Sequence, residues 1–215
     1  MKIVIRGFPG RFFVTGTDTD VGKTLVCAAL MTGMKAFYWK PVQSGCVDGT
    51  DTKWIQDVTG FPDSMFVPET YRLDLPLSPH AAADHDGVTI DMSEFHLPDI
   101  SSDSSLIVEG AGGVMVPLNG DFLMKDLIKQ LDVPVLVVAR STLGTINHTL
   151  LTLSALRAES IPVIGVVLNG EKNPVNRAAI EHYGRVRVVA EIEPIPLIDH
   201  AALLDVFAGF SMETS

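Results

Sequence analysis

The sequence has few cysteines. Only Cys27 and Cys46 occur in 215 residues, and they form no CxxC motif. A disulfide scaffold is therefore not indicated, and two isolated thiols suit a reducing cytoplasm. We expect one inert thiol in the core and one in a loop, in a cytoplasmic protein.

Basic residues are also scarce, with 16 Lys and Arg against 26 Asp and Glu and a net charge of −10. The electrostatic field of this net negative charge repels polyphosphate backbones, so nucleic acid is not expected as a partner. Any anion that the protein binds must be held by hydrogen-bond donors and positive charges close to it. No apolar run reaches membrane-spanning length, and the start MKIVIRGFPG lacks a signal-peptide cleavage pattern. No membrane association is expected.

Several catalytic signatures are missing. The six histidines show no metal-ligand spacing, and there is no HExxH, GxSxG or Cys–His pair with supporting context. Zinc chemistry and nucleophilic catalysis are therefore poorly supported.

The pattern that is present alternates short apolar runs with helical segments. Strands are expected at 11–16, 36–42, 105–110, 134–140 and 162–170, and helices at 25–34, 122–131, 146–160 and 175–184. Nearly continuous apolar strands are typical of a parallel sheet covered on both faces by helices. We predict one α/β domain over 1–215, a three-layer sandwich with a mostly parallel sheet between layers of helices, with residues 1–10 as an extension before the first core strand.

Residues 43–104 differ, because they are polar and rich in Pro, Gly and Asp. A short helix at 51–60 is plausible there, beginning near Asp51 or Thr52. A connection this long within one domain usually carries function.

Ligands of open parallel sheets bind beyond the carboxyl ends of the strands. The polar residues at those ends are Gly16 to Thr24, Lys40, Glu109, Arg140 to Thr145 and Asn169, and the segment 190–197 is a further candidate. These positions form the predicted site.

Residues 12–24, FFVTGTDTDVGKT, resemble a phosphate-binding loop with one glycine displaced. A Walker A loop has Gly, four residues, then Gly-Lys-Ser/Thr, whereas here Gly16 precedes the expected position by one residue. Lys23 would reach the β- and γ-phosphates and the Thr24 hydroxyl would bind Mg²⁺. With this loop between a strand and a helix, we predict that the sandwich is of the P-loop NTPase type. The alternative is a helix start that merely contains glycine. Asp20 would repel a polyphosphate, so we interpret it as facing a cation or a substrate amine.

Three further charged residues accompany the loop. Glu109 ends SLIVEG, where a second Mg²⁺ contact is expected, although a helix-capping or solvent-facing glutamate is the alternative. Asp51 could add another oxygen, since Mg²⁺ favours one or two carboxylates with phosphates and water. Lys40 ends the aromatic run FYWK and could neutralise a transferred phosphoryl group; the alternative is a lysine snorkelling at a sheet edge.

Five sequence blocks resemble one family in their order and position. They are GTDTDVGKT (16–24), KPVQSG (40–45), SPH (78–80), VEGAGG (108–113) and LGTINH (143–148). Together they resemble the dethiobiotin synthetases, over about residues 12–200. The resemblance implies an ATP- and Mg²⁺-dependent cyclo-ligase that takes 7,8-diaminononanoate and CO₂ or bicarbonate through a carbamate and a carbamic–phosphoric anhydride.

The resemblance also implies roles for individual residues. Those implied for catalysis are Lys40, Lys23, Thr19 and Asp20. Those implied for ATP are Asp20, Val21, Gly22, Lys23, Thr24, Leu25, Glu109 and Asn169, of which Asn169 matches the asparagine that reads adenine. Those implied for Mg²⁺ are Thr24, Asp51 and Glu109, and Ser44 matches a serine near the substrate nitrogen.

The family is a homodimer with the substrate at the subunit interface. A helix start of the partner chain, here Gly144, Thr145 and Asn147, would hold the carboxylate tail of the substrate. The family has a glycine shortly before Ile-Pro near the adenine, but this chain reads AEIEPIPLI at 190–198, so no residue is assigned there.

Three other functions fit the sequence less well. A partition or septum-site ATPase carries an additional signature lysine early in the loop, whereas residues 17–21 read TDTDV. A cobyrinate-type amide synthetase needs a glutaminase domain for which 215 residues leave no room. A nucleotide switch without small-molecule turnover has no evident use for the lysine and serine of KPVQSG.

Overall fold

The computed structural model describes residues 7–211 of the protein. Residues 1–6 of the expected N-terminal extension lie outside the described part. Within that part, the Phe8 ring packs against Phe12 and Phe210, with centroid distances of 5.3 and 5.9 Å.

The framework is a parallel sheet of seven strands in the order β4-β2-β6-β1-β7-β8-β9. The strands are β1 (Arg11–Gly16), β2 (Phe37–Trp39), β4 (Phe66–Val67), β6 (Leu106–Gly113), β7 (Val135–Arg140), β8 (Val163–Asn169) and β9 (Val188–Ile192). The predicted parallel sheet is confirmed. Because all strands run the same way, the residues that follow β1, β2 and β7 meet at one edge.

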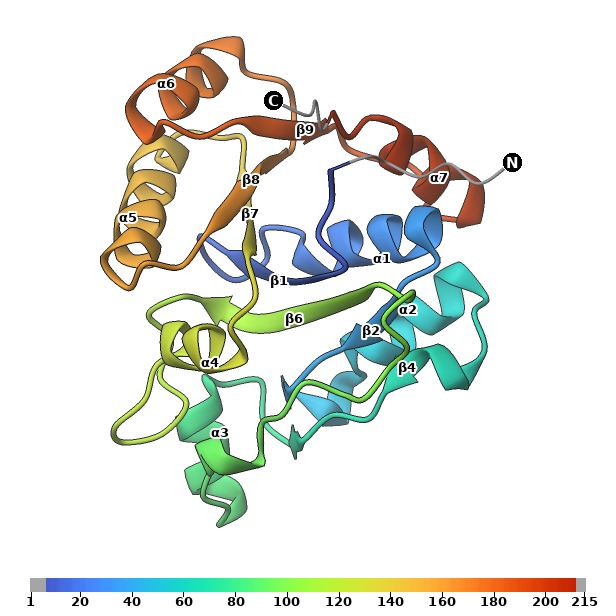
Figure 1. The fold of residues 1–215 in the computed structure, drawn as a ribbon, viewed down its shortest axis with the longest axis vertical. Coiled ribbons are helices and arrows are strands. Elements are labelled where there is room, and N and C mark those ends of the chain that lie inside the picture. The colour runs from blue at the N-terminus through green and yellow to red at the C-terminus, as the bar shows by residue number, and fades with distance from the viewer. Residues whose placement is uncertain (1–6, 212–215) are drawn as a thin grey trace.

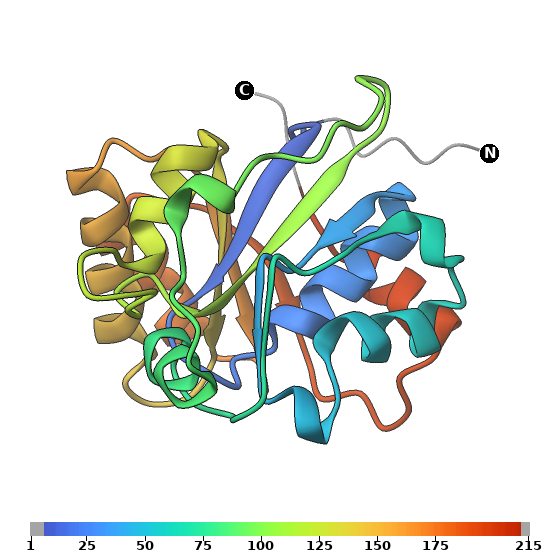
Figure 2. The same cartoon turned by 90° about the horizontal axis from the view of Figure 1, so that it is seen from below.

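Helices cover both faces of this sheet (Figure 1; Figure 2). On one face lie α1 (Lys23–Met34), α2 (Asp51–Thr59) and α7 (His200–Ala208); on the other lie α4 (Met124–Leu131), α5 (Thr145–Ala158) and α6 (Pro174–Gly184). Alternate residues of β1 serve the two faces: Phe12 and Val14 pack with the α1 side and Phe13 with the α4 side. This double burial explains why the strands are almost entirely apolar.

The predicted strand at 36–42 is interrupted in the structure. β2 ends at Trp39, and β3 (Val42–Ser44) pairs with β5 (Tyr71–Leu73) in a separate two-stranded sheet. Pro41 has no N–H to continue the ladder, and its carbonyl oxygen accepts from the Thr70 and Tyr71 N–H groups, each at 3.0 Å. This break directs β3, which ends at Ser44, away from the main sheet.

Other boundaries also differ from the sequence-based expectation. β6 continues to Gly113 instead of stopping at 110, which places Glu109 inside the strand. β9 and α7 were not assigned as elements, and the predicted long loop contains β4, β5 and α3 (Pro79–Asp86) besides α2. These short elements have little periodic signal of their own and depend on packing against the larger core.

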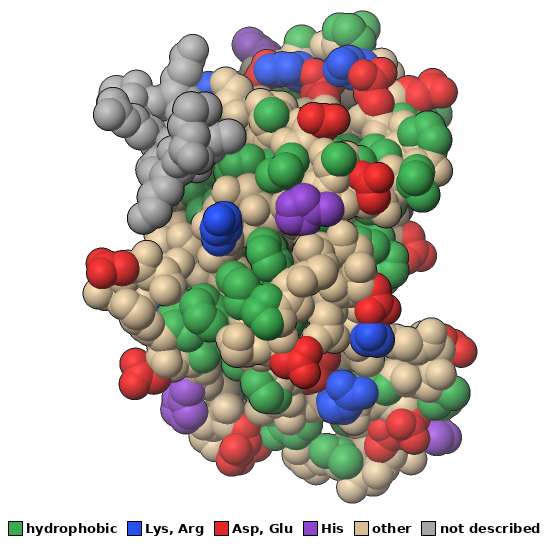
Figure 3. Space-filling model, turned by 90° about the vertical axis from the view of Figure 1, so that its right-hand side faces the viewer, with side chains coloured by type: hydrophobic (Ala, Val, Ile, Leu, Met, Phe, Trp, Pro, Cys, Tyr) green, Lys and Arg blue, Asp and Glu red, His purple; other side chains and the backbone are tan. Residues whose placement is uncertain are grey.

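Between residues 7 and 211 no helix has both the length and the apolar character that crossing a bilayer requires. On the face viewed in Figure 3, acidic side chains are spread among hydrophobic and neutral ones, and the lysines and arginines are scattered.

Candidate active site

The loop between β1 and α1 is shaped by two glycines in tight surroundings. Gly22 has φ 94°, and a Cβ atom there would lie 2.2 Å from Nδ2 of Asn169. A Cβ atom at Gly16 would lie 2.6 Å from the carbonyl oxygen of Asp18. Both positions therefore exclude a side chain, and the displaced glycine belongs to a loop one residue longer than the strict motif.

Lys23, the first residue of α1, points back over this loop. Its side chain is largely buried, and Nζ donates to the carbonyl oxygen of Asp18 at 3.1 Å. Burial lowers the pKa of Lys23, while the carboxylate of Glu109 opposes the shift. The lysine thus lies at the helix N-terminus, where backbone N–H groups favour anions.

Glu109 is fully buried and accepts hydrogen bonds on both carboxylate oxygens. Oε1 accepts from Thr24 Oγ1 at 3.0 Å and from Lys40 Nζ at 2.9 Å, and Oε2 accepts from the Tyr38 hydroxyl at 2.9 Å. The alternative of a solvent-facing or capping glutamate is wrong, because this carboxylate lies in the middle of the sheet.

Lys40 follows β2 and is only 4% exposed. Its ammonium group forms ion pairs with both Glu109 and Asp51. Burial by itself would lower the pKa of Lys40, but the two carboxylates outweigh it and hold the pKa above its ordinary value. A snorkelling lysine at a sheet edge is therefore wrong for this position.

Asp51 is brought to the site by the start of α2. Thr50 caps this helix by accepting from the Lys53 N–H at 3.1 Å, and the Asp51 N–H donates to Oε1 of Gln43 at 3.0 Å. The cap and the glutamine fix the first turn of α2, so the carboxylate of Asp51 faces Lys40.

Three oxygen-bearing residues predicted for Mg²⁺ converge here. Thr24 and Lys40 bond the same oxygen of Glu109, and Lys40 also pairs with Asp51. Within the described residues no group of three or more His, Cys, Asp or Glu side chains is arranged to hold a metal ion. Two carboxylates and a hydroxyl nevertheless fit Mg²⁺, which takes its other ligands from phosphates and water.

The residues predicted to bind the substrate lie on three separate segments: the phosphate loop, the end of β3 and the start of α5. Thr19 and Asp20 are exposed on the loop, and Ser44 at the end of β3 has a buried hydroxyl without a hydrogen-bond partner among the described residues. The α5 start lies on the other side of the loop: Asn147 is exposed and Thr145 buried. Asn169 contacts the loop itself, donating to the carbonyl oxygen of Val21 at 3.0 Å.

Sequence reasoning missed several participants. Tyr38 precedes Lys40 by two residues, so the period of a strand could have placed both on one face. Cys27 lies one helical turn after Lys23 and Thr24, and its pKa is raised by burial and by Glu109. Arg140, which forms an ion pair with Asp18, stood among the strand-end residues but received no role.

A cavity of about 490 Å³ lies between the phosphate loop and α5. Its lining includes Thr17 and Asp18 of the loop, Ser78 before α3, and His148 and Leu151 of α5. The remaining lining residues are mostly apolar, and the cavity reaches the phosphate loop itself.

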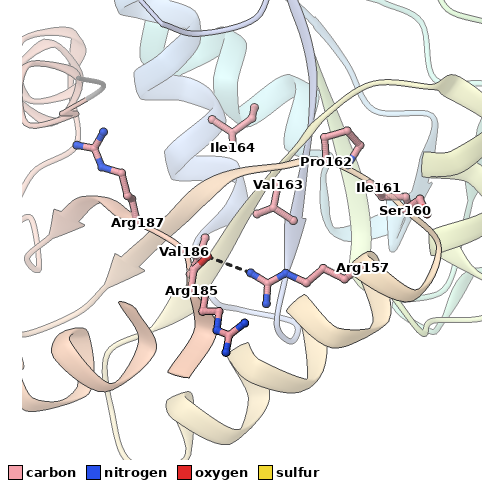
Figure 4. A pocket seen from close by; sticks show the side chains of 9 residues that line it. All are labelled: Arg157, Ser160, Ile161, Pro162, Val163, Ile164, Arg185, Val186 and Arg187. Atoms are coloured by element: carbon pink, nitrogen blue, oxygen red, sulfur yellow. Dashed lines mark hydrogen bonds between the residues drawn. The ribbon is translucent and has the colours of Figure 1, made fainter. Parts of the chain in front are cut away.

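A second cavity, of about 640 Å³, lies where β8 begins, at the opposite edge of the sheet (Figure 4). The side chains of Arg157, Arg185 and Arg187 point in different directions, and Arg157 donates to the carbonyl oxygen of Arg185 at 3.2 Å. None of the predicted site residues lines it.

Residues 10–202 match a family model described as an AAA domain. The chain is 52% identical over 191 residues to an ATP-dependent dethiobiotin synthetase of Paramagnetospirillum magneticum, covering 89% of this chain and 91% of that protein. The chain belongs to the ATP-dependent dethiobiotin synthetase family. A dethiobiotin synthetase of Novosphingobium aromaticivorans is 45% identical over 203 residues, covering 94% and 97% of the two chains.

Solved structures support the fold of this dethiobiotin synthetase family member. A ParA family ATPase from Chlorobium tepidum has a TM-score of 0.55 at 12% identity, covering 95% of this chain and 92% of that one. MinD from Aquifex aeolicus has a TM-score of 0.52 at 11% identity, covering 92% and 94%. At such identities the likeness concerns the fold alone, so the P-loop NTPase fold is confirmed while the sequence relatives decide the family.

Proposed function

We propose that this protein forms the cyclic urea of dethiobiotin from 7,8-diaminononanoate, CO₂ and ATP. The proposal is carried by one observation: a second lysine, Lys40, lies buried beside the phosphate loop, held by Glu109 and Asp51. A site that only holds a nucleotide has no evident need for this lysine. The names of the relatives support the product, dethiobiotin, and the use of ATP.

The proposed reaction has three steps. One amine attacks CO₂, forming a C–N bond, and loses a proton to give a carbamate. A carbamate oxygen then attacks the γ-phosphorus of ATP, the bond to the β,γ-bridging oxygen breaks, and ADP leaves. The second amine attacks the carbonyl carbon of the anhydride, loses a proton, and expels phosphate as the ring closes.

Different groups of the protein are assigned to different parts of the reaction. The loop N–H groups and Lys23 bind the phosphates, and Lys40 stabilises charge on the carbamate and the transferred phosphoryl group. Thr19 and Asp20, exposed on the loop, face the diamine, whose ammonium suits a carboxylate. The unpartnered hydroxyl of Ser44 is available to a substrate nitrogen.

Thr24, Asp51 and Glu109 would hold Mg²⁺, and Asn169 would contact adenine. The ion, when bound, neutralises negative charge on the phosphates. Two isolated cysteines fit a reducing cytoplasm, where we propose that the protein acts.

The working unit that we propose is a homodimer. Exposed apolar side chains, Leu143, Leu151 and Met115, lie at the α5 start and beside the cavity at the phosphate loop. Burying them in a partner would remove apolar surface from water. It would also bring Gly144, Thr145 and Asn147 of one protomer to the substrate tail bound by the other.

The test is phosphate release from MgATP with 7,8-diaminononanoate and bicarbonate, each omitted in turn. We expect release to need both and to be accompanied by a cyclic urea, identified by mass spectrometry. Release that ignores the diamine would refute the proposal and favour a nucleotide-dependent switch.

A further inference from the structure

The ammonium group of Lys40 occupies an unusual position. It lies between two carboxylates that come from different elements, Glu109 in β6 and Asp51 at the start of α2. Glu109 is fully buried, Lys40 is 4% exposed, and the hydroxyl of Thr24 donates to the same oxygen of Glu109. The lysine nitrogen therefore pairs with two of the three predicted magnesium residues and shares an oxygen of Glu109 with the third, Thr24.

A magnesium ion held by Asp51 and Glu109 would need these same oxygens. Its ligand distances are about 2.0–2.1 Å, so an ion bound to both carboxylates would lie where Nζ of Lys40 now lies or directly beside it. Two cations in contact repel strongly in a buried environment. Lys40 and the metal therefore cannot share the two carboxylates.

We propose that Lys40 is a resident cation of the metal site, which a divalent ion displaces from Asp51 and Glu109. This rests on the magnesium assignment made under the proposed function. Once displaced, the ammonium group moves toward the phosphoryl group and the carbamate. Binding of the metal and movement of the Lys40 ammonium group to the reacting atoms are thus coupled.

Exchange of one cation for another costs less free energy than leaving the carboxylate of Glu109 without a cation. A fully buried carboxylate without a cation would be strongly unfavourable, so Glu109 needs a positive partner at all times. The flexible four-carbon stem of lysine permits its ammonium to move between two sets of partners. Lys23 cannot play this part, because its Nζ is bonded to the carbonyl oxygen of Asp18 and to neither carboxylate.

The test is Mn²⁺ binding to the nucleotide-free protein, followed by electron paramagnetic resonance. Lys40→Met keeps the apolar stem and removes the resident cation, so Mn²⁺ affinity should increase by about tenfold or more. Lys40→Arg retains a cation and should not tighten binding. Lys23→Met removes one positive charge nearby without vacating the site, and should increase the affinity much less.

Two results would overturn the proposal: unchanged Mn²⁺ affinity in Lys40→Met, or equal tightening in Lys23→Met, which would reveal only a general field effect. Should Lys40→Met not fold alone, refolding with and without Mn²⁺ replaces the titration. Recovery that requires Mn²⁺ is then expected, and failure to recover with the ion refutes the exchange. Since the assay contains no diamine, failure of the proposed reaction would be seen separately.

Discussion

At the scale of single residues, the site depends on a buried carboxylate whose hydrogen-bonding capacity is satisfied by its neighbours. Glu109 has no solvent exposure, yet hydrogen bonds from Thr24, Tyr38 and Lys40 satisfy both of its oxygens. The sequence predicted Thr24, Lys40, Asp51 and Glu109 as site residues because each lies near the end of a predicted strand or the start of a predicted helix. It could not show that one ammonium bridges two carboxylates, since that contact joins positions far apart in the chain.

Lys40→Ala should lower turnover by about 100-fold or more, the scale for losing one preorganised charge donor. The reason is that the ammonium group beside Glu109 and Asp51 is lost, while Lys23 is bonded to the carbonyl oxygen of Asp18 and does not occupy that position. The measurement is kcat for dethiobiotin formation at saturating MgATP. Lys53→Ala is the control, because Lys53 is exposed and pairs only with Asp57 among the described residues. Near-normal turnover of Lys40→Ala would remove it from the catalytic set.

Gly22→Ala should weaken ATP binding by about tenfold or more, because the new Cβ would collide with Asn169 and strain a φ of 94°. Calorimetric titration with a non-hydrolysable ATP analogue measures the change. The control is Gly87→Ala at the end of α3, where φ is also positive (66°) but a Cβ meets nothing within 4 Å. Equal ATP affinity in the two variants would show that the contact with Asn169 does not shape the loop.

At the scale of elements, the long periodic segments were predictable and the short ones were not. β1, β7, β8, α4, α5 and α6 were found within a few residues because each carries an apolar run or a helix-period pattern in its sequence. Pro41 ended β2 early, and α7 and β9 gave no separate signal before packing on the sheet. The functional loop 43–104 was recognised by its polarity, but the position of α2 within the site was decided by tertiary contacts.

The first turn of α2 links local stability to the proposed metal site. Thr50→Ala removes its cap and should lower the free energy of unfolding by about 1 kcal/mol. It should also raise the Mg²⁺ concentration needed for half-maximal activity, because Asp51 follows directly. Urea unfolding and a Mg²⁺ titration of activity measure the two effects.

The matched control for Thr50→Ala is Asp199→Ala, which removes the cap of α7, a helix of the same length. It should lower stability similarly and leave the Mg²⁺ requirement unchanged. A Mg²⁺ requirement that moves equally in both variants would mean that lost stability, and not the orientation of Asp51, is responsible.

The start of α5 is expected to recognise the remote carboxylate of the substrate. Asn147→Ala should raise KM for 7,8-diaminononanoate by about tenfold or more, the value of one hydrogen bond to a charged group, with little change in kcat. KM for ATP should stay the same. Ser154→Ala, also exposed on α5, is the control. An effect of Asn147→Ala on ATP alone would show that this helix is misassigned.

At the scale of the whole molecule, two regions have different characters: the carboxyl edge of the sheet and the side covered by α5. Its carboxyl edge gathers the phosphate loop, Lys40 and Asp51, while the α5 side presents exposed apolar residues next to the cavity at that loop. Composition predicted an acidic protein, but no sequence pattern distinguished Leu143 and Leu151 from core residues. Periodicity identifies apolar positions without showing which of them stay exposed in one chain.

Leu151→Glu tests whether that surface joins two protomers. Leu151 is 62% exposed, and a charge buried there in a dimer should weaken association by about 100-fold or more. Light scattering after size exclusion should then find a monomer that still binds ATP but turns over the diamine poorly, since the tail contacts come from the partner. Leu204→Glu, on α7 at the opposite face of the sheet, should stay dimeric and active. A fully active monomeric Leu151→Glu would refute the shared substrate site, because each chain would then hold the whole substrate alone.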